Sequence, residues 1–208
     1  MLYNAGGADK AKELGAINYI GNEEYPAGVA GGAYFAAHGS KNVICLNTVP
    51  GAQNLEDRCQ GVADGIAKGG GKSTQLPLPA SSFGNPTAVA EAVKATVLKD
   101  KTIDGLITMS DVDADSAATG IQQAGLTGSV KLGTFNVDET NLERIKAGDE
   151  MFMIDQQGWL QGFLAVTLSD AYVNYGLKLA TAPILTGPGI VDASKIDATI
   201  AGAKAGYR

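Results

Sequence analysis

The chain has 208 residues, a formal net charge of -6, 45% hydrophobic and 18% charged residues, which is ordinary globular composition and excludes a disordered chain. Its Lys and Arg residues are scattered singly, so it lacks the basic patch that binds nucleic acid. No apolar run approaches the roughly 20 residues of a membrane span, and the first residues show no signal peptide. We therefore expect no binding of nucleic acid and no membrane span.

From residue 16 onward, short apolar or β-branched runs alternate with stretches of helical periodicity, separated by Gly, Pro, Asn and Ser. The predicted strands are Ala16–Ile20, Asn42–Leu46, Ser73–Leu78, Gly105–Met109, Lys131–Phe135 and Met151–Ile154. The predicted helices are Tyr25–Ala37, Ala52–Lys68, Pro86–Lys99, Asp113–Ala124, Glu139–Ala147 and Leu160–Tyr175. Strands joined by crossover helices run parallel, and apolar strands suit a sheet covered on both faces. The pattern predicts the α/β class with a doubly wound parallel sheet.

Two cysteines lie 14 positions apart, Cys45 in a predicted strand and Cys59 in the following helix. A disulfide between them depends on their geometry. Because free cysteines are commonly buried, we expect two buried thiols.

Polar residues follow five successive predicted strands. In doubly wound sheets, ligands bind beyond the carboxyl ends of the strands. The groups at these ends are Asn47-Thr48, Ser81-Ser82-Phe83, Ser110-Asp111, Asn136 and Asp155-Gln156-Gln157, and Arg58 lies in the helix after the first of them. Hydroxyl, carboxamide, carboxylate and guanidinium groups suit a polyhydroxylated ligand. Phe83 offers a flat apolar face for a sugar ring.

Each of these residues also has a simpler interpretation. Ser110, Asp111 and Asn136 fit turn and helix-capping chemistry, Phe83 fits core packing, and Arg58 fits a solvated helix position. Their recurrence at one end of the sheet favours a binding site.

Other motifs lack the context that their chemistry requires. Gly-Lys-Ser at residues 71–73 runs from helix to strand, the reverse of a phosphate-binding loop, and the acids between Asp111 and Asp115 lack the later ligands of a calcium loop. The single histidine, His38, has no metal-ligating partner in the sequence. We expect no metal, no cofactor and no catalytic residues. A glycosidase pair of Asp111 with Asp155 is the alternative.

The chain resembles the type I periplasmic sugar-binding proteins, close to ribose-binding proteins, which share their fold with the effector domains of LacI-type repressors. The resemblance runs from about Leu2 to Ser194. Its markers are Ile20-Gly21-Asn22 before a helix, Arg58-Cys59-Gln60-Gly61-Val62, Ser110-Asp111, Thr134-Phe135-Asn136 and Ile154-Asp155-Gln156-Gln157.

The resemblance implies a ligand site and a transport role. It places Arg58, Ser110, Asn136 and Gln156 on ligand-contacting positions, Phe83 beside an aromatic contact, and Tyr3-Asn4 where the family often has Asp-Arg. Because carboxylates are lost at Tyr3 and Asn136, a different sugar, polyol or cyclitol is expected in place of ribose. The implied protein is periplasmic and delivers this ligand to the membrane permease of an ABC-type transporter.

The same resemblance implies a division into lobes, with a complete C-terminal lobe and a partial N-terminal lobe. Residues 1–20 form a remnant of the N-terminal lobe and its hinge, 21–155 the C-terminal lobe, 156–186 a helix and strand returning to the N-terminal lobe, and 187–208 a third crossover and tail. The first strand–helix units of the family are expected to be missing, which leaves the helix with Trp159, Leu160, Phe163, Leu164 and Leu168 without its sheet. Either two copies associate as a homodimer through this face, or a longer natural chain covers it, and this form is expected to bind ligand weakly at most.

Two other functions remain open. The effector core of a LacI-type regulator would need a DNA-binding segment upstream. A sugar-processing enzyme would turn over a sugar.

Overall fold

Two separate sheets organise the chain. The computed structural model describes residues 1–208, apart from the side chains of Pro77 and Ala80. The smaller sheet has the order β1-β2-β8, with all strands parallel. Its unit consists of β1 (Leu2–Asn4), α1 (Gly7–Glu13), β2 (Tyr19–Gly21), α7 (Gly158–Tyr175) and β8 (Ile184–Leu185).

The larger sheet has the order β4-β3-β5-β6-β7-β9, and only β9 runs antiparallel to its neighbour. Its strands are β3 (Asn42–Asn47), β4 (Lys72–Pro77), β5 (Gly105–Thr108), β6 (Lys131–Phe135), β7 (Phe152–Asp155) and β9 (Gly189–Val191). The helices of this unit are α2 (Glu24–Ala37), α3 (Gln53–Ala67), α4 (Pro86–Lys99), α5 (Asp111–Gln123), α6 (Glu139–Ala147) and α8 (Ile196–Lys204), with a short 3-10 helix η1 (Ala80–Ser82) after β4.

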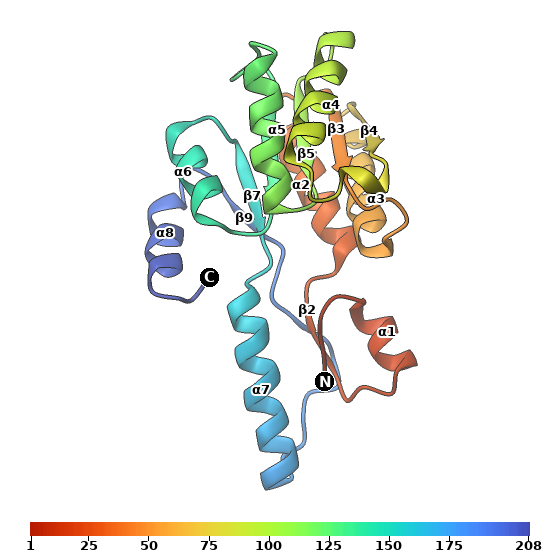
Figure 1. The fold of residues 1–208 in the computed structure, drawn as a ribbon. Coiled ribbons are helices and arrows are strands. Elements are labelled where there is room, and N and C mark those ends of the chain that lie inside the picture. Colours follow the sequence, from red (N-terminus) through yellow and green to blue (C-terminus); the bar gives the residue numbers. More distant parts are fainter.

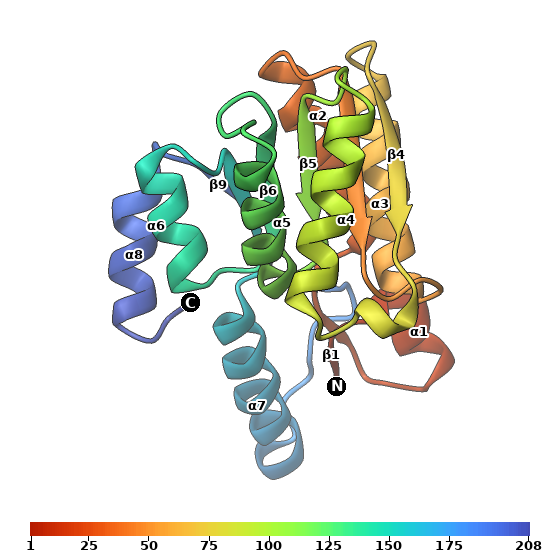
Figure 2. The same cartoon turned by 45° about the horizontal axis from the view of Figure 1, so that its top comes forward.

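Helices cover both faces of the larger sheet, so the doubly wound α/β prediction is confirmed (Figures 1 and 2). Helices α2 and α3 pack on one face around Phe35, Val62 and Phe152. Helices α4 and α5 cover the other face around Val93 and Leu106. Helices α6 and α8 continue that second layer over β7 and β9.

Three crossovers connect the two units (Figure 1). They are β2 to α2, β7 to α7 and β8 to β9, and they are hydrogen-bonded to one another. Thr186, in the third crossover, donates its backbone N–H to the Gly21 oxygen at the end of β2 at 2.9 Å, and its Oγ1 donates to the backbone oxygen of Gln156 at 2.8 Å. The predicted crossover and tail, residues 187–208, additionally supplies β9 and α8 to the larger unit.

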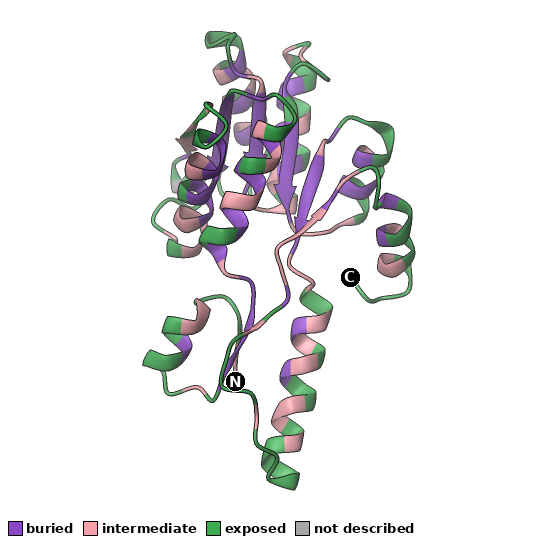
Figure 3. Ribbon diagram, turned by 180° about the vertical axis from the view of Figure 1, so that it is seen from behind, coloured by how far each residue is buried: buried purple, intermediate pink, exposed green. Residues whose placement is uncertain are grey.

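The smaller unit covers only part of α7, as the burial colouring shows (Figure 3). The helix packs against β1 and β2, so the expectation that it stands without its sheet is wrong. Its outer side nevertheless exposes Trp159 and Phe163, whose rings stack with centroids 5.1 Å apart. Association of two copies through this face stays a prediction. None of the helices in the described part of the chain has both the length and the apolarity needed to cross a membrane.

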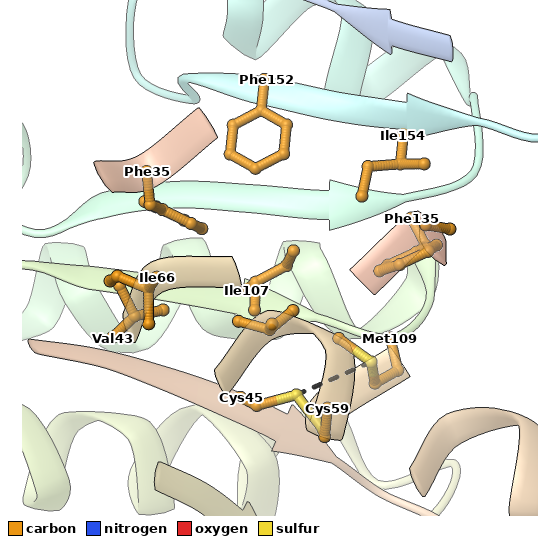
Figure 4. Close-up of a cluster of buried hydrophobic side chains, with 12 residues drawn as sticks. Phe35, Val43, Cys45, Cys59, Ile66, Ile107, Met109, Phe135, Phe152 and Ile154 are labelled. Carbon is orange, nitrogen blue, oxygen red and sulfur yellow. Dashed lines mark hydrogen bonds between the residues drawn. A yellow bond between two sulfur atoms is a disulfide. The ribbon is translucent and has the colours of Figure 1, made fainter. Parts of the chain in front are cut away.

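A disulfide joins Cys45 on β3 to Cys59 on α3 (Figure 4), so the expectation of two free thiols is wrong. Both residues face the same core cluster, and their Cα atoms lie 5.7 Å apart, within the range that a disulfide spans. Met109 Sδ lies 3.7 Å from the Cys45 sulfur. Because the disulfide leaves Cys45 no proton, this is a packing contact.

Replacing both Cys45 and Cys59 by Ala is expected to lower the free energy of unfolding by about 3 kcal/mol. The reason is that the bridge closes a short loop, with a sequence separation of 14, and so restricts the unfolded chain. Urea denaturation of the variant and of the wild type, with and without a thiol reductant, measures this difference. An unchanged denaturation midpoint in the variant would contradict the assignment.

Candidate ligand-binding site

The carboxyl ends of β3, β5, β6 and β7 lie at one edge of the larger sheet because these strands run parallel. At this edge three side chains form a hydrogen-bonded row, which we call the amide row. Asn136 Nδ2 donates to Asp111 Oδ1 at 3.1 Å, and Asn136 Oδ1 accepts from Gln156 Nε2 at 2.5 Å. The row thus connects residues that follow β5, β6 and β7.

The backbone of Asn136 turns sharply away from β6. Its φ is 74°, in the left-handed region that asparagine tolerates better than most residues. Its backbone N–H still donates to the Ile154 oxygen at 3.0 Å. The side chain is therefore held at the strand end and is only partly buried.

Gln156 is fixed mainly through its backbone. Its carbonyl oxygen accepts from Gln161 Nε2 and Thr186 Oγ1, both at 2.8 Å. Its side-chain Oε1 is buried and accepts from no group among the described residues. Because a buried oxygen without a partner is costly, this atom is an unsatisfied hydrogen-bond acceptor at the end of the row. Asp111 Oδ2 and the second N–H of Asn136 add a further acceptor and a donor.

Ser110 serves mainly as the cap of α5. Its Oγ accepts from Asp113 N at 3.4 Å and donates to Asp113 Oδ2 at 2.9 Å. Thr48 Oγ1 also donates to Asp113 Oδ2, at 2.8 Å. The capping interpretation of Ser110 therefore holds, and the hydroxyl is already engaged beside the amide row.

Arg58 lies behind this edge, where it is 5% exposed. Its Nε donates to Glu24 Oε2 at 2.6 Å and its Nη1 to the Met109 oxygen at 2.7 Å. The guanidinium carbon lies 4.3 Å from the centre of the Phe135 ring. These contacts exclude the interpretation of Arg58 as a solvated helix residue, and they leave one N–H of Nη1 and both of Nη2 as its remaining donors.

Close packing of α2 on α3 brings Arg58 to Glu24. A Cβ at Gly28 would lie 2.1 Å from the Arg58 oxygen, and one at Gly61 would lie 2.2 Å from the Tyr25 oxygen. Only glycine permits this approach. Burial raises the pKa of Glu24, while the hydrogen bond and charge of Arg58 oppose this rise. The pair is thus a desolvated acid–base contact next to the amide row.

Asn4 and Phe83 stand apart from the amide row. Asn4 lies on β1 of the smaller sheet, is exposed, and has a φ of 71°. Phe83 follows η1 at the β4 side of the larger sheet and is 70% exposed, which contradicts the core-packing alternative. Neither side chain makes a hydrogen bond or ring contact with the amide row among the described contacts. Their roles in a site stay predictions.

Several residues of this region escaped prediction from the sequence. They are Glu24, Asp113, Gln161 and Thr186, which hold Arg58, Ser110 and Gln156 in place. The acidic residues at the starts of α2 and α5 are the only signal, and such residues are common at helix starts for reasons of capping and dipole alone. Thr186 belongs to a crossover without periodicity.

The Asp155 carboxylate is engaged by other groups. It is 3% exposed, accepts from Gln157 N at 2.6 Å and pairs with Arg208. These contacts occupy both of its oxygens, so they do not favour the glycosidase pair of Asp111 with Asp155.

Comparison with known proteins identifies the family of this chain. A family model described as a periplasmic binding protein domain matches residues 1–178. A carbohydrate transporter from Acidothermus cellulolyticus 11B in complex with myo-inositol shares 31% sequence identity and a TM-score of 0.87, and the match covers 99% of this chain and 69% of that chain. No curated protein matches the sequence.

Two more distant structures show the same fold. A periplasmic solute-binding protein of an ABC transporter from Actinobacillus succinogenes 130z, with bound D-allose, is 22% identical with a TM-score of 0.78, and the match covers 92% of this chain and 66% of that one. A periplasmic ribose ABC transporter from Conexibacter woesei DSM 14684 is 18% identical with a TM-score of 0.79, covering 93% and 65%. The chain therefore spans about two thirds of the length of these relatives, and it belongs to the periplasmic binding protein domain family.

Proposed function

We propose that this chain is the solute-binding component of an ABC-type uptake system, located in the periplasm, and that it binds a small neutral sugar, polyol or cyclitol. The amide row carries this proposal. Its carboxamide and carboxylate groups offer alternating donors and acceptors, including the unpartnered Gln156 Oε1, and a polyhydroxylated molecule presents matching hydroxyl groups.

The charges favour a neutral ligand over an anionic one. The two arginines of this region are already paired, Arg58 with Glu24 and Arg208 with Asp155. Asp111 adds a further carboxylate within the row. A sugar acid or sugar phosphate would therefore bring a negative charge to a site with no surplus positive charge.

The family members with bound myo-inositol and D-allose support a ligand of this class. We further propose that the two units close on the ligand by rotation at the three crossovers, and that the closed form is presented to a membrane permease. The smaller unit then supplies the second wall of the site.

Isothermal calorimetry tests the proposal at protein concentrations that detect millimolar binding. We expect saturable binding of at least one of myo-inositol, D-allose and D-ribose, and none of D-gluconate as an anionic control. Asn136→Ala and Gln156→Ala are expected to weaken that binding by about tenfold or more, since each removes a buried hydrogen bond to the ligand.

Asn174→Ala is the matched control, because this exposed carboxamide on α7 bonds only to Asp170. It is expected to leave the affinity unchanged. Absence of saturable heat with every neutral polyol, or equal affinity in wild type and Gln156→Ala, would contradict the proposal.

A further inference from the structure

Tyr207 and Arg208, which follow α8, contact both sides of the crossover from β7 to α7. The Arg208 guanidinium pairs with Asp155, the last residue of β7. The Tyr207 ring meets Trp159, in the first turn of α7, edge-on at a centroid distance of 4.8 Å. These two residues therefore span residues 156–158, where the chain passes from the larger unit to the smaller one.

The larger unit anchors these residues. Ile196 of α8 packs with Met153 and Val191 in a buried cluster. After the helix, Gly206 adopts a φ of +78°, and Tyr207 N donates to the Gly202 oxygen at 2.9 Å. The Arg208 side chain then crosses Gly202, where a Cβ would lie 3.3 Å from Arg208 Nε. The glycine at 202 leaves room for this path.

A buried charge holds Arg208 at the crossover. Asp155 is 3% exposed, and its Oδ1 accepts from Gln157 N at 2.6 Å. Its Oδ2 pairs with Arg208. Because a buried carboxylate is costly without a cation, this contact stabilises both residues in the arrangement described.

The ion pair of Arg208 with Asp155 is linked to the amide row through the backbone. Gln156 lies between Asp155 and Gln157, and Gln157 has a φ of 56°, which is unusual for a residue other than glycine. Such a backbone persists where its surroundings fix it. Asp155 is part of those surroundings through its bond to Gln157 N, and Arg208 pairs with Asp155.

We propose that Tyr207 and Arg208 form a brace across the β7–α7 crossover, which restrains rotation of α7 against the larger sheet and positions Gln156 in the amide row. The effect on a ligand rests on the proposed function. The effect on the crossover does not.

Trp159 is the only tryptophan of the chain, so its fluorescence reports directly on the brace. Arg208→Ala keeps the Tyr207 ring but removes the ion pair. We expect this variant to shift the emission maximum of Trp159 and to speed amide hydrogen exchange severalfold in residues 155–161. Tyr207→Ala is expected to produce the same two changes, and Arg208→Lys is expected to restore part of the wild-type behaviour.

Lys99→Ala is the control, because it removes an exposed cation from α4 and changes the net charge equally. It is expected to change neither readout. Wild-type emission and exchange in Arg208→Ala would overturn the brace. Exchange that rises equally throughout the chain would also overturn it, since that result indicates a loss of global stability only.

Calorimetry with myo-inositol separates the brace from the proposed function. If the wild type binds, we expect Arg208→Ala to weaken the affinity at least threefold, and an unchanged affinity would overturn the positioning of Gln156. If the wild type shows no binding, the proposed function fails while fluorescence and exchange still decide the brace.

Discussion

Arg58→Ala is expected to lower the free energy of unfolding by about 3 to 5 kcal/mol and to abolish ligand binding. The substitution leaves Glu24 buried without its cation, and loss of one partner of a buried pair is strongly destabilising. Burial already raises the pKa of Glu24 against the opposing effect of Arg58, so this pKa rises further in the variant. The destabilisation relative to the wild type therefore grows as the pH rises through the raised pKa that Glu24 has in the folded wild type. Denaturation at several pH values measures it.

Stability and binding are separated by replacing the whole pair. Glu24→Leu combined with Arg58→Met removes both charges and fills the space with apolar groups, which is often neutral or stabilising. We expect the double variant to regain most of the lost stability and still not to bind. Binding at wild-type affinity in the double variant would contradict a ligand contact by Arg58.

Glu150 is expected to make the free energy of unfolding fall steeply as the pH rises from 4.5 to about 8. Burial raises the pKa of this carboxyl to about 8, against the opposing influence of Arg144, while Asp138 and Asp115 raise it slightly. The folded form therefore holds a proton that the unfolded form releases above 4.5. The stabilisation is complete below 4.5 and is lost as the pH rises through about 8. At about 1.4 kcal/mol for each pKa unit, the loss reaches roughly 5 kcal/mol.

Glu150→Gln removes the ionisation and retains an oxygen for the contact with Arg144 Nε, which is 3.1 Å in the wild type. We expect this variant to be more stable than the wild type at pH 9 and to show a flatter dependence of the thermal midpoint on pH. Glu143→Gln, at an exposed position of α6, is the control. Parallel curves for the wild type and Glu150→Gln would be inconsistent with a raised pKa of Glu150.

Local signals in the sequence predict much of the larger unit. The helices Pro86–Lys99 and Glu139–Ala147 match the structure at both ends. Their starts are marked by Asn85 and Asp138, which cap them with side-chain oxygens, and Gly148 ends the second helix in a left-handed conformation. The strand Lys131–Phe135 also matches. Where no cap or turn residue defines the end, the boundaries shift, as for the strand predicted at Ala16–Ile20 and found at Tyr19–Gly21.

Long-range contacts explain what the sequence does not show. The strands β8 and β9 have only two and three residues, too few for a periodic pattern, and they exist because β2 and β7 offer them edges to pair with. The disulfide depends on how closely α3 lies to β3. None of these distances is encoded in local periodicity.

The candidate site also contains residues that the sequence predicts and residues that it does not. The rule that polar residues gather at the carboxyl ends of parallel strands is sufficient to find Asp111, Asn136 and Gln156. It does not distinguish a cap from a ligand contact, as Ser110 shows. It also cannot find the Glu24 carboxylate, which reaches Arg58 only because glycines let α2 approach α3.

The most direct test of the central claim, that the amide row is a ligand-binding wall, is the NMR spectrum of the side-chain amides. We expect titration with the best-binding neutral polyol to shift the NH₂ resonances of Asn136 and Gln156 with one common dissociation constant, while those of the exposed Asn174 stay in place. Saturable binding without a shift of the Asn136 or Gln156 side-chain resonances would contradict the claim.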